Sequence, residues 1–160
     1  MELDREAIEK LIPHRPPFLF VDRIIQVEEN LRIVGIKDVR GDEWFFPGHF
    51  PGAPLMPGVL VIEAIAQTAA CLTSLNPAYR GRFVYFAALN DVRFRHPVLP
   101  GDRLVMEAQV RWTRGRHGRV MGKATVNGKV VAEGELTFAI SEATDELRRA
   151  AGGSGAPRDK

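Results

Sequence analysis

Residues 45–63 read FFPGHFPGAPLMPGVLVIE, and the rest of the chain is organised around this stretch. It begins as a loop in which four prolines and three glycines surround one histidine, His49. Prolines fix the backbone angle φ and glycines permit unusual turns, so such a loop is expected to hold its histidine in place. After Pro57 the sequence becomes apolar, and Glu63 lies inside that apolar run. A carboxylate in such a run needs a partner or a task.

The apolar run predicts one long helix over residues 59–75. Nearly every position is apolar or small all the way round, which is typical of a helix enclosed by its own domain. The polar residues fall at intervals of four, four and three on one narrow stripe: Glu63, Gln67, Cys71 and Ser74. For Gln67 and Ser74 we expect ordinary hydrogen bonds to a neighbouring element, and for Glu63 a functional role.

The remaining segments predict a short helix and six strands. Asp4 can cap a helix that ends near Leu11. Strand composition and turn residues predict strands over residues 18–28, 31–39, 83–94, 103–113, 120–126 and 129–140. Asn127-Gly128 is a strong hairpin signal between the last two. Six antiparallel strands and one buried helix pack best if the sheet curls around the helix, an α+β fold. Residues 1–142 are expected to form this single domain and residues 143–160 a flexible tail, with at least a dimer to cover the sheet edges.

Composition limits the class of protein. The chain has 160 residues, a formal net charge of +2 and a single cysteine, Cys71. These values favour one soluble domain in a reducing compartment, the cytoplasm, and give no overall field for nucleic acid. We expect no signal peptide and no membrane span. A group of arginines in the C-terminal half is either a solvated face or a docking patch for an acidic partner: Arg93, Arg95, Arg103, Arg111, Arg114, Arg116 and Arg119.

His49, Glu63 and the start of the long helix could together perform acid–base chemistry. Histidine suits the role of a base, and a buried glutamate has a raised pKa that suits a proton donor. The free N–H groups near Gly58 suit an oxygen that gains negative charge. This combination predicts proton abstraction next to a carbonyl with loss of a β-substituent. No second ligand has metal spacing to His49, so we expect no metal site.

Three other histidines and the cysteine have more ordinary interpretations. His14 lies among prolines and is interpreted as a turn residue. His96 and His117 lie in turns rich in Pro, Gly and Arg, and we expect both on the surface. Cys71 is interpreted as a small buried apolar residue rather than a reactive thiol.

Three motifs resemble those of one enzyme family. Residues 49–67 fit the pattern HFPGxPxMPGVLxxEAxAQ, which closely resembles the signature of the (3R)-hydroxyacyl-acyl-carrier-protein dehydratases of type II fatty-acid synthesis. Residues 11–23, LIPHRPPFLFVDR, and residues 92–102, VRFRHPVxPGD, resemble its N-terminal segment and a later strand and turn. The resemblance covers about residues 8–140.

This resemblance implies a fold, an assembly and roles for individual residues. It implies the hotdog fold, homodimers assembled into a hexamer, acyl carrier protein as the partner, and no cofactor beyond the phosphopantetheine arm of the substrate. His49 would remove the C2 proton and Glu63 of the partner chain would assist departure of the 3-hydroxyl. Gly58 N–H would hold the thioester oxygen, and Tyr85 would gate the acyl tunnel. The residues expected to bind substrate are Gly58, Val59, Tyr85, Phe50 and Gln67.

Two features of the sequence refine the resemblance, and two rival functions remain open. Glu63 stands where the related dehydratase–isomerases have Asp, so isomerase activity is not expected. Residues 88–90, ALN, depart from the family's more common small-Ile-Asp and leave the chain-length preference open. The rival functions are a hotdog acyl thioesterase, in which a carboxylate activates water, and a non-catalytic acyl-binding module.

Overall fold

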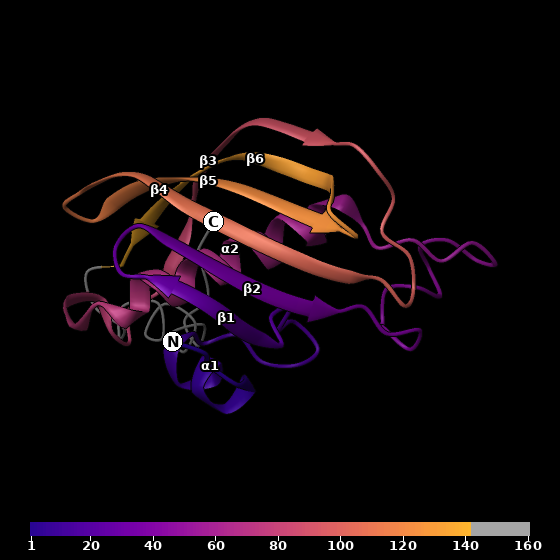
Figure 1. Ribbon diagram of the computed structural model, residues 1–160, viewed down its shortest axis with the longest axis horizontal. Coiled ribbons are helices and arrows are strands. Elements are labelled where there is room, and N and C mark those ends of the chain that lie inside the picture. Colours follow the sequence, from indigo (N-terminus) through magenta and orange to yellow (C-terminus); the bar gives the residue numbers. More distant parts are fainter. Residues whose placement is uncertain (142–160) are drawn as a thin grey trace, which may run out of the picture.

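The protein is a curled antiparallel sheet wrapped around one long helix. A computed structural model describes residues 1–141 of the chain. Six strands form a single sheet, and helix α2, Gly58–Leu75, lies in its concave side (Figure 1). The expected combination of curled sheet and central helix is confirmed. The tail predicted over residues 143–160 lies outside the described residues.

The elements lie close to the predicted ranges. Helix α1, Arg5–Leu11, begins where the Asp4 carboxylate accepts a hydrogen bond from Ala7 N at 2.9 Å. A 3₁₀ turn, η1, Pro77–Tyr79, follows α2. The strands are β1 Arg23–Glu28, β2 Arg32–Asp38, β3 Val84–Phe94, β4 Arg103–Arg114, β5 His117–Val126 and β6 Lys129–Ile140. Asn127 and Gly128 both have positive φ between β5 and β6, as the hairpin signal predicted.

The order of the strands in the sheet differs from their order in the chain. The sheet runs β1-β2-β4-β5-β6-β3, so β3 pairs with β6 at the far edge and β4 pairs with β2. The four strands after α2 therefore lie side by side in the sheet, but in the order β4-β5-β6-β3 and not in chain order. The connection over residues 95–102 runs from β3 at the sheet edge past β6 and β5 to β4, which a tight hairpin could not do.

The first strand is shorter than predicted because a side chain of α2 takes up the backbone groups ahead of it. β1 begins at Arg23, whereas a strand from residue 18 was predicted. Gln67 accepts a hydrogen bond from Phe20 N at 2.8 Å and donates one to Phe18 O at 3.0 Å. These backbone groups are thus paired with a helix side chain and not with a neighbouring strand.

Two glycines let the sheet approach α2 closely. A Cβ atom on Gly122 of β5 would lie 2.4 Å from Ile65 Cγ2, and one on Gly35 of β2 would lie 2.9 Å from Thr68 Oγ1. Both helix residues are fully buried. By length and composition α2 could cross a membrane, but most of it is buried inside the domain, as expected for a core helix.

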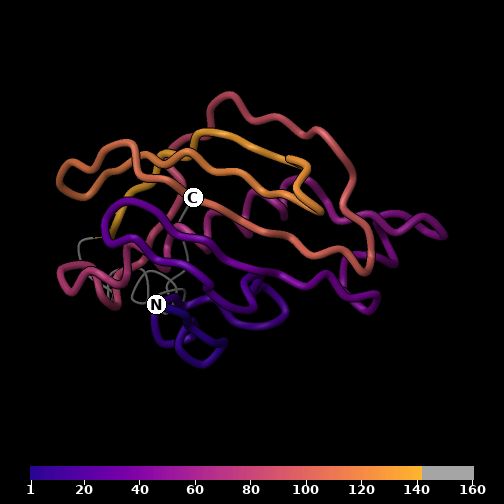
Figure 2. The backbone as a smooth tube through the Cα atoms, viewed as in Figure 1, coloured from indigo at the N-terminus to yellow at the C-terminus, as the bar shows by residue number. Residues whose placement is uncertain are grey.

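Two segments project from opposite ends of the sheet. The loop that carries His49 extends from the end where α2 begins, and the turn between β4 and β5 extends from the other end (Figure 2). A buried ion pair joins the base of the His49 loop to the sheet. Glu43 of the loop accepts it through Oε1, which lies 2.7 Å from Nζ of Lys37 on β2. The histidine is thus presented at one end of the helix.

Candidate active site

Glu63 lies in the second turn of α2 and faces a cavity of about 210 Å³. Its Oε1 accepts a hydrogen bond from Gln67 Nε2 at 3.0 Å and lies 3.5 Å from His14 Nε2. Burial raises the pKa of the Glu63 carboxyl, and the hydrogen bond from Gln67 offsets only part of that rise. A carboxyl group in this setting retains its proton more strongly than one in water.

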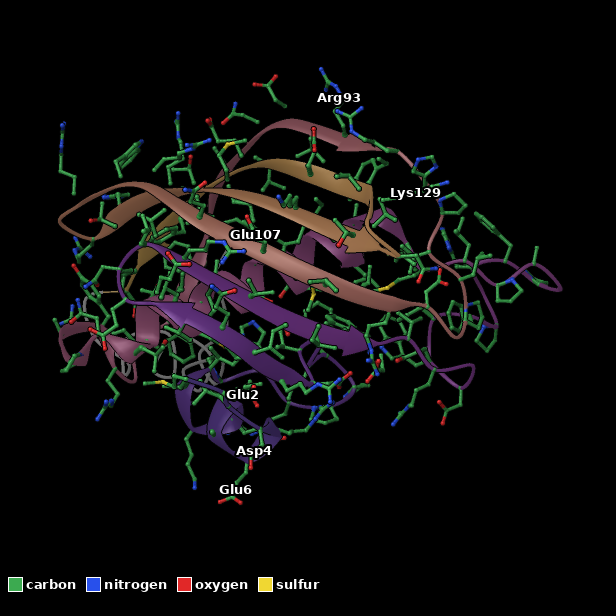
Figure 3. The ribbon with its side chains drawn as sticks, in the orientation of Figure 1. Glu2, Asp4, Glu6, Arg93, Glu107 and Lys129 are labelled. Carbon is green, nitrogen blue, oxygen red and sulfur yellow. The ribbon has the colours of Figure 1, made fainter. Side chains whose placement is uncertain are left out.

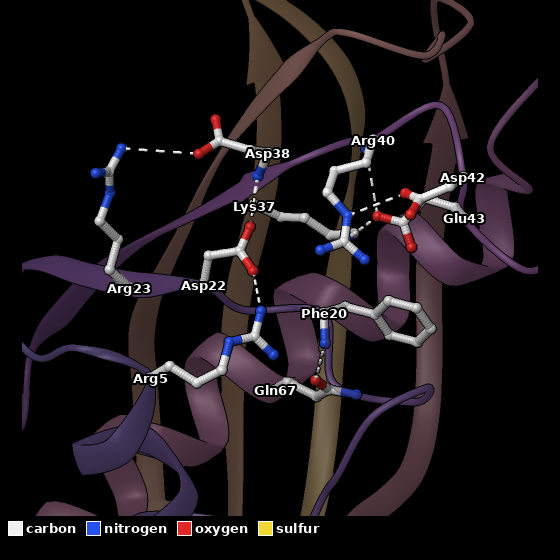
Figure 4. A network of polar contacts seen from close by, with 10 residues as sticks. All are labelled: Arg5, Phe20, Asp22, Arg23, Lys37, Asp38, Arg40, Asp42, Glu43 and Gln67. Atoms are coloured by element: carbon white, nitrogen blue, oxygen red, sulfur yellow. Dashed lines mark hydrogen bonds and ion pairs between the residues drawn. The ribbon is translucent and has the colours of Figure 1, made fainter.

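Gln67 holds this part of the site together. Its side chain is 1% exposed and bonds to Glu63 as well as to the backbone of Phe18 and Phe20. Figure 4 shows the bond to Phe20 beside the ion pair of Arg5 with Asp22 and that of Arg23 on β1 with Asp38 on β2. The prediction that Gln67 makes ordinary hydrogen bonds to a neighbouring element is confirmed, and one of its bonds also orients Glu63.

His14 is the residue of this cavity that the sequence did not reveal. It was interpreted as a turn residue, but its ring lines the cavity beside Glu63. Its Nδ1 is buried and has no hydrogen-bond partner among residues 1–141. Burial lowers the pKa of His14, and the charge of Arg15 lowers it further. The usable signal was its place in the motif of residues 11–23.

His49 is held by the backbone of its loop. Its Nδ1 lies 2.7 Å from the carbonyl oxygen of Leu55, and its ring stacks on Phe50 with centroids 4.0 Å apart. Both backbone polar groups of His49 are hydrogen-bonded. Its N–H donates to Phe46 O at 3.2 Å, and its carbonyl oxygen accepts from Leu55 N at 2.8 Å. A carbonyl oxygen can only accept, so Nδ1 carries the proton and the neutral ring has its lone pair on Nε2.

The first turn of α2 presents backbone donors beside this histidine. Leu60 and Val61 donate the first hydrogen bonds of the helix, both to Pro57 O. The N–H groups of Gly58 and Val59 precede them and have no carbonyl one turn earlier in the helix. A Cβ atom on Gly58 would lie 2.7 Å from the Phe94 ring, so only glycine fits without moving that ring. His49, Gly58 and Val59 line one cavity of about 530 Å³.

The predicted site residues therefore fall into two groups within one protomer. Glu63, Gln67 and Tyr85 line the first cavity together with His14. His49, Gly58 and Val59 line the second, and Phe50 lies against the His49 ring. Neither of these two cavities contains both the histidine and the glutamate.

The arginine group is also divided. Arg103 and Arg114 are the first and last residues of β4, so the seven side chains belong to opposite ends of the sheet. Arg93 lies on β3 at the outer edge of the sheet (Figure 3), and Arg95 lines the His49 cavity. The other four lie on or near the turn between β4 and β5: Arg111, Arg114, Arg116 and Arg119.

Three further expectations are confirmed. His96 and His117 are exposed. Cys71 is fully buried, and burial raises the pKa of its thiol to about 12, which leaves it a poor nucleophile.

Comparison with known proteins identifies the family. Residues 12–137 match the family model of the FabA-like domain. The chain belongs to the FabA-like family. Curated relatives of this FabA-like chain include a 3-hydroxyacyl-[acyl-carrier-protein] dehydratase FabZ of Herpetosiphon aurantiacus, 53% identical over 135 residues. That match covers 84% of this chain and 96% of the relative. The FabZ of Bacillus subtilis is 50% identical over 140 residues, which cover 88% and 99% of the two chains.

Solved structures show the same fold. The dehydratase heterocomplex ApeI:P from Xenorhabdus doucetiae matches with a TM-score of 0.74 at 18% identity, over 89% of this FabA-like chain and 96% of that chain. Cj0977 of Campylobacter jejuni matches with a TM-score of 0.64 at 18% identity, over 85% of this chain and 96% of that chain. The predicted hotdog fold and the predicted family are both confirmed.

Proposed function

We propose that this protein removes water from (3R)-3-hydroxyacyl groups on acyl carrier protein and yields the trans-2-enoyl product in fatty-acid elongation. The observation that carries the proposal is 53% identity, over 84% of the chain, to a curated dehydratase of that specificity. The acyl group arrives on the phosphopantetheine arm of the carrier protein, and the proposed chemistry uses no metal or further cofactor. The proposed compartment is the cytoplasm.

The proposed reaction begins at the thioester carbonyl. Gly58 N–H binds the carbonyl oxygen at the positive end of the α2 dipole and stabilises the charge that grows there. His49 Nε2 takes the proton from C2, and the electrons of that C–H bond form the double bond between C2 and C3 as the C3–O bond breaks. The 3-hydroxyl leaves with a proton from Glu63 as water.

The contacts of Glu63 support its role as the acid. Both Gln67 Nε2 and His14 Nε2 approach the same oxygen, Oε1, at 3.0 and 3.5 Å. An N–H on the partnerless Nδ1 of His14 would be a buried unpaired donor, so the proton of the neutral ring belongs on Nε2, facing Glu63. With the Gln67 amide donating to Oε1 and the His14 ring beside the same oxygen, the acidic proton is placed on Oε2, where a substrate hydroxyl can receive it. His14 thus acts as a positioning residue.

A second protomer completes the proposed site. His49 and Glu63 line different cavities of one chain, and β3 is an edge strand with exposed Tyr85, Phe86 and Leu89. A long apolar sheet edge is a surface that proteins cover. We propose that two chains pair so that His49 of one faces Glu63 of the other, with three such dimers in a hexamer.

The carrier protein is proposed to dock near the cavity that contains His49. Arg95 and His96 line that cavity, and Arg93 lies close by on β3. Basic side chains at the mouth suit the acidic surface of a carrier protein and the phosphate of its arm. We propose that Tyr85, which is half exposed at the other cavity, gates the acyl chain.

The test is hydration of a crotonyl thioester by two variants. His49→Ala and Glu63→Gln should each lower kcat by about 10²–10⁴-fold, because each removes one partner of the acid–base pair. Glu6→Gln, at an exposed position of α1, is the matched control and should keep full activity. Sedimentation should show the same assembly for all variants.

Two further measurements distinguish the rival functions. Release of free thiol from an acyl thioester, with no water loss, would make the protein a thioesterase. Binding of acyl pantetheine without turnover would make it a binding module. Near-normal activity of either catalytic variant would refute the mechanism.

A further inference from the structure

Two cavities lie end to end along α2. The one that contains Glu63 holds about 210 Å³, and the next holds about 150 Å³. They share four lining residues: Ala69, Thr73, Val120 and Phe138. The first cavity therefore ends where the second begins.

The position of the cavities along the helix sets the lengths involved. Glu63 to Thr73 spans ten residues of helix, about 15 Å at the usual rise, and Asn76 in the second cavity lies about 5 Å further. Beyond Glu63 and Gln67 the first cavity is lined mainly by small and apolar side chains, among them Ala66, Ala70 and Leu136. An acyl tail that starts beside Glu63 would extend along this apolar wall.

Phe138 is the large side chain at the junction. It lies on β6, opposite Gly118 of β5 and Phe86 of β3, and is 8% exposed. A Cβ atom on Gly118 would lie 2.3 Å from Phe138 Cζ, so the ring rests directly over the glycine backbone. Any larger residue at 118 would push the ring out of this position.

We propose that Phe138, seated on Gly118, is the partition that ends the acyl cavity and sets the longest acyl chain the enzyme accepts. The inference rests on the proposed function and names the length determinant of that same site. A tail that reaches Phe138 must either stop or displace the ring into the second cavity. When an apolar pocket excludes one methylene of a substrate, kcat/KM for that substrate falls by roughly 10-fold.

The second cavity is suited to receive a longer tail once the ring is removed. Leu72, Val110 and Ile140 give it apolar walls. Its outer end carries Asn76 and Tyr79, whose hydroxyl donates to Gly115 O at 3.1 Å. The continuous path would thus run from Glu63 to the turn between β4 and β5.

The experiment compares kcat/KM for 3-hydroxybutyryl, 3-hydroxydecanoyl and 3-hydroxypalmitoyl carrier protein. Wild type should discriminate against the palmitoyl chain. Phe138→Ala should raise the palmitoyl-to-butyryl ratio by at least about 10-fold, and Phe138→Leu should raise it less. The butyryl value should stay within about twofold in both variants, because the short chain ends before the partition.

Two further variants separate the partition from general loosening of the core. Leu72 lines the second cavity and not the first, so Leu72→Ala should leave the ratio unchanged, yet raise it further when combined with Phe138→Ala. Gly118→Ala displaces the ring from its seat and should change the decanoyl value before the butyryl one.

The outcomes distinguish this inference from the function on which it rests. An unchanged ratio in a folded Phe138→Ala or Phe138→Leu variant that dehydrates the butyryl substrate would overturn the partition and leave the dehydratase intact. Equal wild-type values for all three substrates would overturn it as well. Failure of wild type to dehydrate any substrate would overturn the function itself.

Discussion

At the scale of single residues, Glu63 combines an ionisable group with a position that disfavours its charge. The carboxyl faces a cavity that Ala66, Ala69 and Ala70 help to line, and Gln67 and His14 are the polar residues that approach its Oε1. Its raised pKa means that the folded state binds the proton more tightly than the unfolded chain does. The free energy that the protonated Glu63 contributes to folding is thus fully present below the ordinary carboxyl pKa. It is lost as the pH rises through the pKa of Glu63 in the folded state.

Glu63→Gln should therefore stabilise the protein at neutral pH while abolishing activity. An amide loses no proton, so the Tm of the variant should exceed that of wild type by a few degrees, since about 1 kcal/mol corresponds to roughly 2–4 °C for a chain of this size. The difference should shrink as pH falls below the ordinary carboxyl range. Thermal unfolding followed by circular dichroism from acid to neutral pH tests this, with Glu6→Gln as the exposed control. A constant difference at all pH values would contradict it.

His14 should affect the pH profile of catalysis and not only its rate. His14→Phe replaces the polar ring edge 3.5 Å from Glu63 Oε1 with an apolar one, which should further disfavour the ionised carboxylate and raise the pKa of Glu63. The alkaline limb of the kcat profile should then move to higher pH, and kcat should fall by up to about 10²-fold. His14→Gln, which keeps an N–H at a similar reach, should restore both in part. A purely structural role would lower kcat without moving the limb.

At the scale of elements, the contact between α2 and the sheet depends on backbone glycines. Gly122→Ala would drive a methyl group into Ile65, which is fully buried and has no room to move. The free energy of unfolding should fall by about 1–3 kcal/mol, as in other overpacked cores. Gly41→Ala is the control, because nothing lies within 4 Å of its added Cβ. Urea denaturation of both variants measures the difference, and equal midpoints would show that the helix can shift to accommodate the methyl group.

The same elements show what a sequence can and cannot predict here. Local signals predicted α2, both of its ends and the Asn127-Gly128 hairpin, because each depends on neighbours in the chain. The place of β3 beside β6 was not predicted, since the pairing of distant strands leaves no local pattern. Glu63 was anomalous within its own segment and could be found there. The burial of His14 beside Glu63 could not be predicted in this way, because it is created by α2, which follows much later in the sequence.

At the scale of the whole molecule, one protomer leaves a long edge uncovered. β3 runs over eleven residues, pairs on one side only within residues 1–141, and exposes Tyr85, Phe86, Leu89 and Phe94 to 41% or more. Such an edge invites pairing with another chain. The two groups of site residues, each incomplete alone, give this pairing a catalytic consequence.

Mixing two inactive variants tests that consequence. In a two-fold symmetric dimer of His49→Ala with Glu63→Gln, one site receives both intact residues and the other receives both substitutions. Random exchange makes half of the dimers mixed, so activity should recover to roughly a quarter of the wild-type value. Crotonyl thioester hydration after co-refolding measures it. The control is the double variant, with both substitutions in one chain, mixed with either single variant, which should recover nothing. Heterodimers that are shown by mass spectrometry but remain inactive would assign both residues to a site within one chain.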